Sequence, residues 1–345
     1  MIIALDAMGG DNAPDIVVRG AAVARERFPD VHFLLFGDES RLAPLLDAHS
    51  ELKSCTSIRH APDAISSSDK PSQALRGGRQ SSMRFAINAV REGEADAIVS
   101  AGNTGALMAI SKFVLKTLPG IDRPAIASFF PTMRGETLML DLGANIDCDS
   151  DNLVQFAVMG EVFVRTVQAI EKPSIGLLNV GSEELKGNDS VRRASAILRK
   201  IHLPIHFHGF VEGDDIAAGT VDVIVTDGFS GNVALKTAEG VVKLFTTYLK
   251  ETYKSSILAK IGYLFSRSAL NRLRERLDPR AYNGAVLLGL NGIVVKSHGG
   301  TDEVGFAHAI GVAYDMIANG FNESIKAEFE QLSLDTESLT QEDII

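Results

Sequence analysis

The residues best suited to chemistry stand in short polar loops, each of which follows an apolar run. Lys186 lies beside a glycine and an asparagine in "SEELKGN", and His298 lies between a serine and a glycine in "KSHGGTD". Both side chains also have a structural interpretation: a solvated loop lysine, and a turn histidine that makes one hydrogen bond. We treat both as candidate catalytic residues, together with Asn232 in "TDGFSGN".

Small residues and amides fill the same loops. The strongest single pattern is "SAGNTGALMA", in which a glycine turn enters a helix, because free N–H groups and the helix dipole favour an anion there. Ordinary turn geometry explains each loop taken alone. Six such loops after apolar runs nevertheless predict one shared anion-binding cleft at the carboxyl ends of the strands. Its candidate residues are Asn12, Gly102, Asn103, Thr104, Gly105, Asn145, Asn188 and Ser230.

Several familiar catalytic patterns are missing. The glycines of "DAMGGDNAP" match neither the dinucleotide fingerprint nor the P-loop, so we expect no nucleotide cofactor. "GFSGN" resembles a nucleophile elbow only loosely. The carboxylates of Asp6 and Asp11 lack the spacing of a metal site, and we expect no metal. They are expected to fix neighbouring N–H groups or the Lys186 side chain. These observations favour transfer chemistry in which the substrate supplies the nucleophile.

The elements that must position these loops alternate along the chain. Near-continuous apolar strands such as "ADAIVS" and "SIGLLNV" are followed by amphipathic helical stretches. This order predicts an α/β fold with three layers, α/β/α, around a mostly parallel sheet. We expect a single catalytic domain with a cleft over residues 1–330, and an acidic flexible tail over residues 331–345. The Ser-, Gly- and Arg-rich stretch 66–82 predicts a mobile surface loop that enters a helix.

The charge of the chain is uneven. It carries 34 Lys and Arg against 44 Asp and Glu, a net charge of −10, which argues against nucleic acid as a partner. Residues 250–280, in contrast, hold eight basic and three acidic residues. This basic amphipathic helical segment predicts a membrane-surface element or a site for an acidic partner, and the alternative is a helical hairpin at a dimer interface. Its candidate contact residues are Lys254, Ile257, Ile261, Leu264, Phe265, Arg272, Arg274 and Arg276.

Taken together and in order, the motifs resemble the phosphate acyltransferase PlsX family. They are "ALDAMGGDNAP", "SAGNTGALMA", "LDLGAN", "LLNVGSEELKGN", "TDGFSGNVALK" and "KSHGGTD", and the resemblance extends from residue 1 to about residue 327. It implies a fold similar to phosphate acetyltransferases and isocitrate-type dehydrogenases. It also implies transfer of a long-chain acyl group from acyl carrier protein to inorganic phosphate, with no covalent enzyme intermediate, for phospholipid synthesis.

The resemblance further implies roles and partners. Lys186 would be the cation for phosphate or the transition state, Asn103 and Thr104 would bind phosphate or the oxyanion, and His298 would protonate the leaving thiol or orient phosphate. Ser230 and Asn232 are second candidates for the oxyanion. We expect a cytoplasmic homodimer without a signal peptide, bound peripherally to the membrane and supplying a glycerol-3-phosphate acyltransferase. The competing classes are an acyl-CoA-dependent phosphate acetyltransferase, an NAD- and metal-dependent dehydrogenase, and a non-enzymatic peripheral membrane protein.

Overall fold

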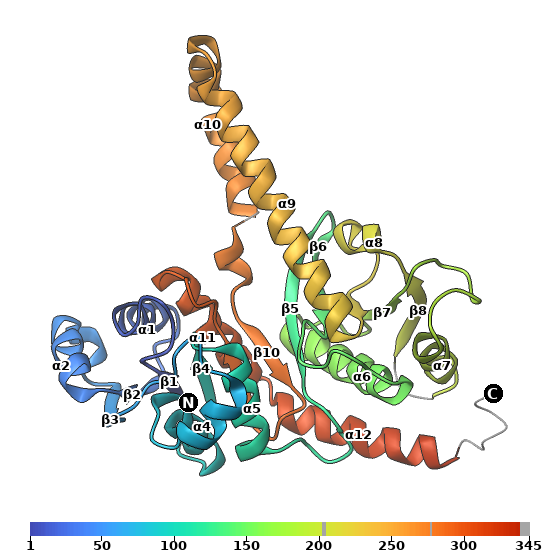
Figure 1. Ribbon diagram of the computed structural model, residues 1–345, viewed down its shortest axis with the longest axis horizontal. Coiled ribbons are helices and arrows are strands. Elements are labelled where there is room, and N and C mark those ends of the chain that lie inside the picture. Colours follow the sequence, from blue (N-terminus) through green and yellow to red (C-terminus); the bar gives the residue numbers. More distant parts are fainter. Residues whose placement is uncertain (202–204, 277, 339–345) are drawn as a thin grey trace.

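One mixed sheet of eleven strands extends through the chain in the order β3-β2-β1-β4-β11-β10-β5-β6-β9-β7-β8 (Figure 1). The computed structural model describes residues 1–201, 205–276 and 278–338. The strands are β1 (Ile2–Asp6), β2 (His32–Gly37), β3 (Thr56–His60), β4 (Ala97–Ser100), β5 (Ala125–Thr132), β6 (Gly135–Leu140), β7 (Ser174–Leu178), β8 (His206–Val211), β9 (Val223–Val225), β10 (Ala285–Leu288) and β11 (Ile293–Lys296).

Helices connect the strands and cover the sheet. They are α1 (Asp15–Arg27), α2 (Glu39–Ala48), α3 (Pro71–Gly77), α4 (Ser82–Arg91), α5 (Thr104–Leu115), α6 (Ser150–Val167), α7 (Asp189–Leu198), α8 (Gly213–Ala218), α9 (Gly228–Lys254), α10 (Ile257–Arg276), α11 (Glu303–Ala318) and α12 (Phe321–Ser338), with short 3-10 turns η1 (Ser50–Leu52) and η2 (Pro279–Tyr282).

Both faces of the sheet are buried, which confirms the three-layer α/β/α prediction. Along β1, Ile3 and Leu5 join the core that contains α1 and α11, whereas Ala4 between them joins the core under α4 and α5. The same alternation places Met139 of β6 in a third cluster against α9. Because successive side chains of a strand point to opposite faces, an apolar strand without alternation requires helices on both sides.

The direction of the strands reverses near the middle of the sheet. Seven of the ten strand pairs are parallel, and the three antiparallel pairs are β10–β11, β10–β5 and β5–β6. As a result β6, β9, β7 and β8 run opposite to β5. The loops that end β1, β4 and β11 therefore lie together at one edge of the sheet, whereas β6, β9 and β7 run in the opposite direction and end at the other edge.

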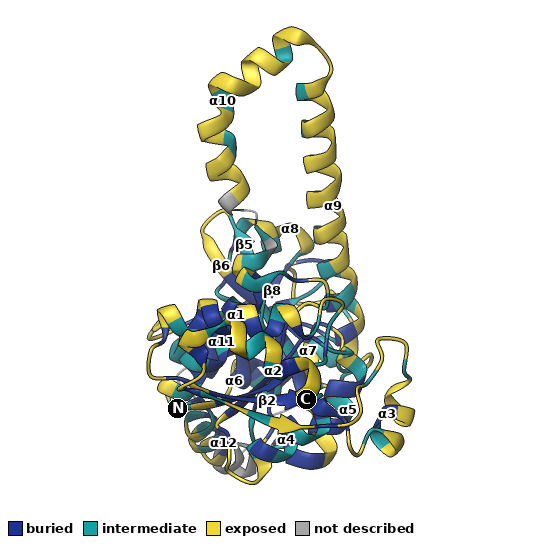
Figure 2. Cartoon of the chain, turned by 90° about the vertical axis from the view of Figure 1, so that its left-hand side faces the viewer, coloured by how far each residue is buried: buried dark blue, intermediate teal, exposed yellow. Residues whose placement is uncertain are grey.

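A long helical hairpin rises from the body of the protein. It is made by α9 and α10, and Figure 2 shows that most of its length is exposed. The predicted basic segment 250–280 covers the end of α9, a turn at Ser255 and Ser256, and all of α10. Tyr253 and Tyr263 pack edge-on with their ring centroids 5.5 Å apart and help to close the tip.

The candidate contact residues of this segment are exposed. The exposed fractions are 77% for Ile257, 45% for Ile261, 67% for Leu264 and 88% for Phe265. Lys254, Arg272 and Arg274 are also exposed, and the side chain of Arg276 lies outside the described residues. No helix within the described ranges is long and apolar enough to cross a membrane.

The C-terminal helix is longer than the sequence indicated. α12 continues past residue 330, where we expected the flexible tail to begin, and ends at Ser338. It packs against α6, where the buried Glu161 accepts hydrogen bonds from Arg165, which also pairs with Glu328 of α12. The rest of the predicted tail, residues 339–345, lies outside the described residues.

Candidate active site

Three of the six loops meet in one cleft of about 680 Å³ at the start of α5. The loops after β1, β4 and β11 form most of it, and residues 64–67 form the remaining wall. We call it the α5 cleft. Its lining residues are Met8, Gly10, Asp11, Ala64, Ile65, Ser66, Ser67, Ala101, Gly102, Asn103, Thr104, Gly105, Lys296 and Gly299.

The buried carboxylate of Asp6 holds the loops together beneath the cleft. Asp6 is 1% exposed, and it accepts hydrogen bonds from the hydroxyls of Ser82 (2.5 Å) and Ser100 (2.7 Å). The Ser100 hydroxyl in turn accepts the Gly102 N–H at 3.1 Å. A Cβ on Gly9 would lie only 2.5 Å from the Asp6 carboxylate, so the first loop can approach this closely only as glycine. The first and third loops are joined by the Asp11 N–H, which donates to Gly299 O.

Lys296, the last residue of β11, brings a cation into this cleft. The side chain is 9% exposed, and its Nζ donates hydrogen bonds to the carbonyl oxygens of Ala101 and Ser297. Burial lowers the pKa of Lys296 to about 8, although the nearby carboxylates of Asp6 and Asp11 act in the opposite direction. Burial raises the pKa of Asp6, and the hydrogen bonds from Ser100 and Ser82 oppose that shift. The Lys296 amine is therefore mostly protonated at neutral pH, and it loses its proton at slightly higher pH.

The N-terminus of α5 supplies free donors to the same cleft. Asn103 is the N-cap residue, and its Oδ1 accepts the Ala106 N–H at 3.0 Å. In the described chain neither the Thr104 N–H nor the Gly105 N–H has a hydrogen-bond partner. Free N–H groups at a helix start attract anions, and a neighbouring ammonium adds to that attraction. The geometry is that of a site for a small anion.

Asn103 has a second role that the sequence did not indicate. Its Nδ2 donates to the carbonyl oxygens of Ser66 (3.3 Å), Ser67 (3.0 Å) and Asp69 (2.9 Å). These bonds fasten the predicted surface loop over the start of α5, and α3 begins just after it. Asn103 thus shapes the wall of the cleft, and its amide is already occupied.

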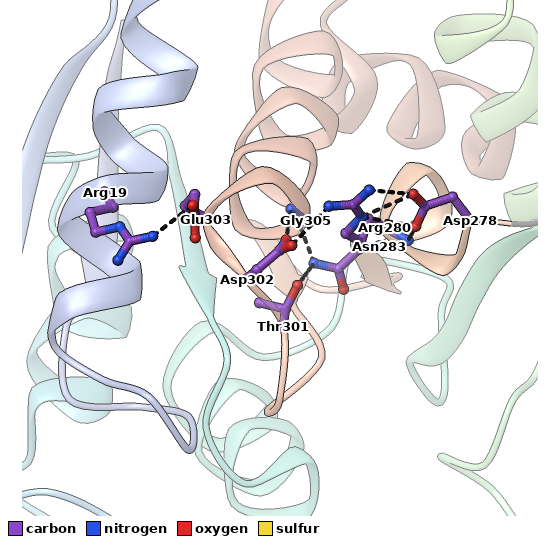
Figure 3. A network of polar contacts seen from close by, with 8 residues as sticks. All are labelled: Arg19, Asp278, Arg280, Asn283, Thr301, Asp302, Glu303 and Gly305. Carbon is purple, nitrogen blue, oxygen red and sulfur yellow. Dashed lines mark hydrogen bonds and ion pairs between the residues drawn. The ribbon is translucent and has the colours of Figure 1, made fainter. Parts of the chain in front are cut away.

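The third loop is held by the polar network in Figure 3. Asn283 donates to Gly305 O at 2.6 Å. Outside the residues drawn there, Asn283 also donates to Ser297 Oγ (2.8 Å) and accepts the His298 N–H at 2.8 Å. Arg280 of η2 pairs with both Asp278 and Asp302. Because η2 directly follows the hairpin, this network connects the base of the hairpin to the loop that carries Lys296 and His298.

Two of the predicted residues lie beside the cleft without lining it. His298 is exposed next to the lining residue Gly299, and its Nδ1 accepts the Gly300 N–H at 3.1 Å. Asn12 is exposed next to the lining residue Asp11. Both are close enough in the chain to contribute to a larger ligand.

A second group of predicted residues gathers around another buried carboxylate. Asp141 accepts the N–H groups of Ile126, Gly143, Ala144 and Asn145, and also the Asn145 side chain. Burial raises the pKa of Asp141, and these hydrogen bonds oppose the shift. Asn232 donates to Leu142 O (3.0 Å), and Ser230 Oγ donates to Asp227 (2.9 Å). These polar side chains fix the loops after β6 and β9, and none of them lines the α5 cleft.

Lys186 and Asn188 lie in a third place, the loop after β7. Lys186 is exposed, and Asn188 caps α7 by accepting the Val191 N–H at 2.9 Å. Four strands separate β7 from β11 in the sheet. The structure therefore does not bring Lys186 to Asp6 or to the α5 cleft, and the cation near Asp6 is Lys296. Lys296 is the residue that sequence reasoning missed, and its only signal was a lysine directly after the apolar run "IVV" in "IVVKSHGGTD".

Over the described ranges no group of three or more metal-ligating side chains comes together. The two cysteines do not form a disulfide, and Cys55 is buried. Burial and the nearby carboxylates raise the pKa of the Cys148 thiol to about 12. A thiolate is therefore a poor candidate for the chemistry of the site.

Comparison with known proteins identifies the chain's relatives. A family model described as "Fatty acid synthesis protein" matches residues 1–324. A phosphate acyltransferase of Paramagnetospirillum magneticum is 64% identical over 96% of this chain and 94% of its own length. A phosphate acyltransferase of Rhodospirillum centenum is 66% identical over 96% of this chain and 93% of its own length.

Solved structures share the fold at low sequence identity. A phosphotransacetylase of Streptococcus pyogenes aligns over 92% of this chain and 94% of its own, with a TM-score of 0.64 and 17% identity. A branched-chain phosphotransacylase of Enterococcus faecalis aligns over 92% and 99%, with a TM-score of 0.55 and 14% identity. The expected likeness to phosphate acetyltransferases is confirmed for the fold.

The double role of Asn103 yields a first prediction. Asn103→Ala removes the α5 N-cap and three loop hydrogen bonds, so the free energy of unfolding should fall by about 2 kcal/mol. Amide hydrogen exchange at Asp69 and Gln73 should become faster in the same variant. Asn188→Ala is the matched control, because it removes only the α7 cap, and it should cost about 1 kcal/mol without changing exchange at those amides. Unchanged exchange at Asp69 in Asn103→Ala would show that the loop is held by something else.

Proposed function

Because this chain belongs to the family of fatty acid synthesis proteins and is a phosphate acyltransferase, we propose that it transfers a long-chain acyl group from acyl carrier protein to inorganic phosphate. The product is acyl phosphate, which feeds phospholipid synthesis. The observation that carries the proposal is the meeting of Lys296 with the free N–H groups of Thr104 and Gly105 in one cleft. Such a site suits a phosphate dianion.

In the proposed reaction a phosphate oxygen attacks the carbonyl carbon of the thioester. A tetrahedral oxyanion forms and collapses, the C–S bond breaks, and the carrier thiolate takes up the proton that phosphate loses. Lys296 and the N-terminus of α5 hold the phosphate with one oxygen free to attack. No enzyme nucleophile is needed, since phosphate is the nucleophile.

The oxyanion and the leaving group need their own partners. Preorganised donors at a developing oxyanion contribute about 3 kcal/mol each to transition-state stabilisation. Thr104 lines the α5 cleft and Asn12 lies beside it. His298, exposed beside Gly299, is our candidate for protonating the leaving thiolate. The other two loop groups hold candidates for contacts with the acyl donor, namely Ser230, Asn232, Asn145, Asn188 and Lys186.

The activity is tested by phosphate-dependent release of free carrier thiol from long-chain acyl carrier protein. We expect release that requires phosphate and saturates with it, and formation of acyl phosphate in equal amount. Acyl-CoA in place of the carrier protein tests the phosphate acetyltransferase alternative, and NADH absorbance with candidate hydroxyacids tests the dehydrogenase alternative. Thiol release that is independent of phosphate would contradict the proposed reaction.

The pKa of Lys296 predicts how phosphate binding depends on pH. The ammonium form predominates below about pH 8 and is lost above it, so the KM for phosphate should rise about fivefold between about pH 8 and about pH 9. Lys296→Met should raise that KM about 30-fold near neutral pH and abolish the alkaline rise, because a charge-assisted contact of about 2 kcal/mol is lost.

Lys186→Ala is the comparison variant for this test. We expect it to change the KM for phosphate less than about threefold, with circular dichroism confirming that all variants fold. A strong loss of turnover in Lys186→Ala with a near-normal Lys296→Met would instead support the lysine that the sequence favoured.

We also propose that the hairpin binds the membrane surface, which makes the protein a peripheral membrane enzyme of the cytoplasm. Exposed Leu264 and Phe265 lie in the first half of α10, and the exposed cations Lys254, Arg272 and Arg274 lie on the same hairpin. Apolar side chains insert at the acyl boundary, while cations meet anionic headgroups. The same proposal includes a homodimer, which light scattering tests. It also includes delivery of the acyl phosphate product to a membrane glycerol-3-phosphate acyltransferase.

Sedimentation with anionic vesicles tests the hairpin. Leu264→Asp with Phe265→Asp should weaken binding at least about tenfold, because two large apolar contacts are lost and two charges are added. Charge reversal of Arg272, Arg274 and Arg276 should weaken it in a salt-dependent way. Met133→Asp with Leu185→Asp is the matched control, since those side chains are 82% and 86% exposed elsewhere. Equal loss in the control would contradict a specific role for the hairpin.

A further inference from the structure

A second basic surface lies beside the α5 cleft, on α3 and α4. Residues 70–91 contain five Lys or Arg and no Asp or Glu, in a chain whose net charge is −10. We call Lys70, Arg76, Arg79 and Arg84 the α3–α4 surface. Lys70, Arg76 and Arg79 are exposed, and Arg84 is half-buried.

The cations of this surface have no acidic partner in the part of the chain that the structure describes. Among the described residues, none of Lys70, Arg76 and Arg79 forms an ion pair, whereas the neighbouring Arg91 pairs with Glu92. Burial lowers the pKa of Arg84, and repulsion from Arg91 and Arg79 adds to the shift, so these like charges lie close together. Clustered charges without a counter-charge cost stability, and an external anionic partner would relieve that cost.

An exposed aromatic residue adjoins the surface at Arg84. The guanidinium of Arg84 lies over the ring of Phe113 in α5, 5.5 Å from its centroid, and Phe113 is 63% exposed. An exposed aromatic residue beside arginines is typical of protein-binding sites, where the ring supplies the anchor and the cations surround it.

The position of the surface matters most. Ser66 and Ser67 line the α5 cleft, and the chain continues from them through Lys70 into α3. At the start of α3 Pro71 packs so closely on Gly105 that a Cβ on this glycine would lie 2.7 Å from Pro71 Cγ. The α3–α4 surface therefore begins where the wall of the cleft ends. Figure 2 shows α3 beside α5, at the far end of the molecule from the hairpin tip.

We propose that the α3–α4 surface docks an acidic carrier protein, which delivers its thioester arm into the adjacent α5 cleft. The inference rests on the proposed function, because it assumes that the acyl group arrives on a carrier protein. The hairpin is a poorer dock, since α9 leaves the core after Ala238 and its remaining residues place the tip about 24 Å beyond the body at 1.5 Å per residue. A second copy of this chain is also a poor occupant, because a two-fold contact would oppose one set of arginines to the other.

The test is steady-state kinetics with acyl carrier protein as the varied substrate. We expect the KM for acyl carrier protein to rise at least about tenfold, with little change in kcat, in the triple variant Lys70→Glu, Arg76→Glu and Arg79→Glu. The reason is that charges at the rim of an interface mainly govern how fast the two proteins associate. Raising the salt concentration should weaken the wild-type reaction and affect the variant much less. The matched control is the triple variant Lys172→Glu, Arg193→Glu and Lys200→Glu, which makes the same change of charge at exposed positions around α7. Its KM for acyl carrier protein should stay within about twofold of wild type.

The outcomes separate the two levels of the proposal. If wild type does not turn over acyl carrier protein with phosphate, the proposed function fails and the docking inference fails with it. If wild type is active and the α3–α4 variant matches the α7 control, docking occurs elsewhere and only the inference is overturned. A variant that loses vesicle binding, or changes its oligomeric state in light scattering, with an unchanged KM would assign the surface to a membrane or to a second copy instead.

Discussion

The buried carboxylate of Asp6 is the constraint on which the cleft depends. A carboxylate that is buried without hydrogen-bond or ionic partners is strongly destabilised. Asp6 avoids this because it accepts hydrogen bonds from the hydroxyls of Ser82 and Ser100 and lies near the Lys296 ammonium. Those partners come from α4, β4 and β11, so one charge ties together three elements that are far apart in sequence. The glycines of the first loop follow from the same constraint, because a side chain at Gly9 would collide with the carboxylate.

Two consequences reach the ligand site. The chain of contacts from Asp6 through Ser100 to Gly102 fixes the turn that opens α5, and so it aims the free N–H groups of Thr104 and Gly105 at the cleft. The carboxylates near Lys296 keep its ammonium charged at neutral pH although it is buried. The protein thus presents a preorganised ammonium group and free N–H donors, without a metal-ligand cluster in its described residues. The network around Asn283 extends this order to the base of the hairpin (Figure 3).

Much of the architecture was readable from the sequence. Apolar runs alternating with amphipathic stretches predicted the α/β/α layers, and "SAGNTGALMA" predicted a glycine turn that enters a helix, whose first residues line the cleft. The sequence wrongly favoured Lys186 for this cleft because a lysine among Gly and Asn looks accessible to a ligand. In addition, no single motif shows the reversal of strand direction between β11 and β6. The polar turn "MRGE" between two apolar runs was the available signal of an antiparallel step. Lys296 was hidden because its importance depends on Asp6, which is distant in the sequence and adjacent only through β4.

The central claim is that phosphate sits between Lys296 and the N-terminus of α5. The most direct measurement is a phosphate titration of the whole protein followed by backbone amide chemical shifts. We predict that the largest saturable shifts occur at Thr104 and Gly105, and that bound phosphate raises the pKa of Lys296 above about 8, as an adjacent anion must. Shifts centred on the loops of Lys186 or Ser230, with Thr104 and Gly105 unaffected, would contradict the account.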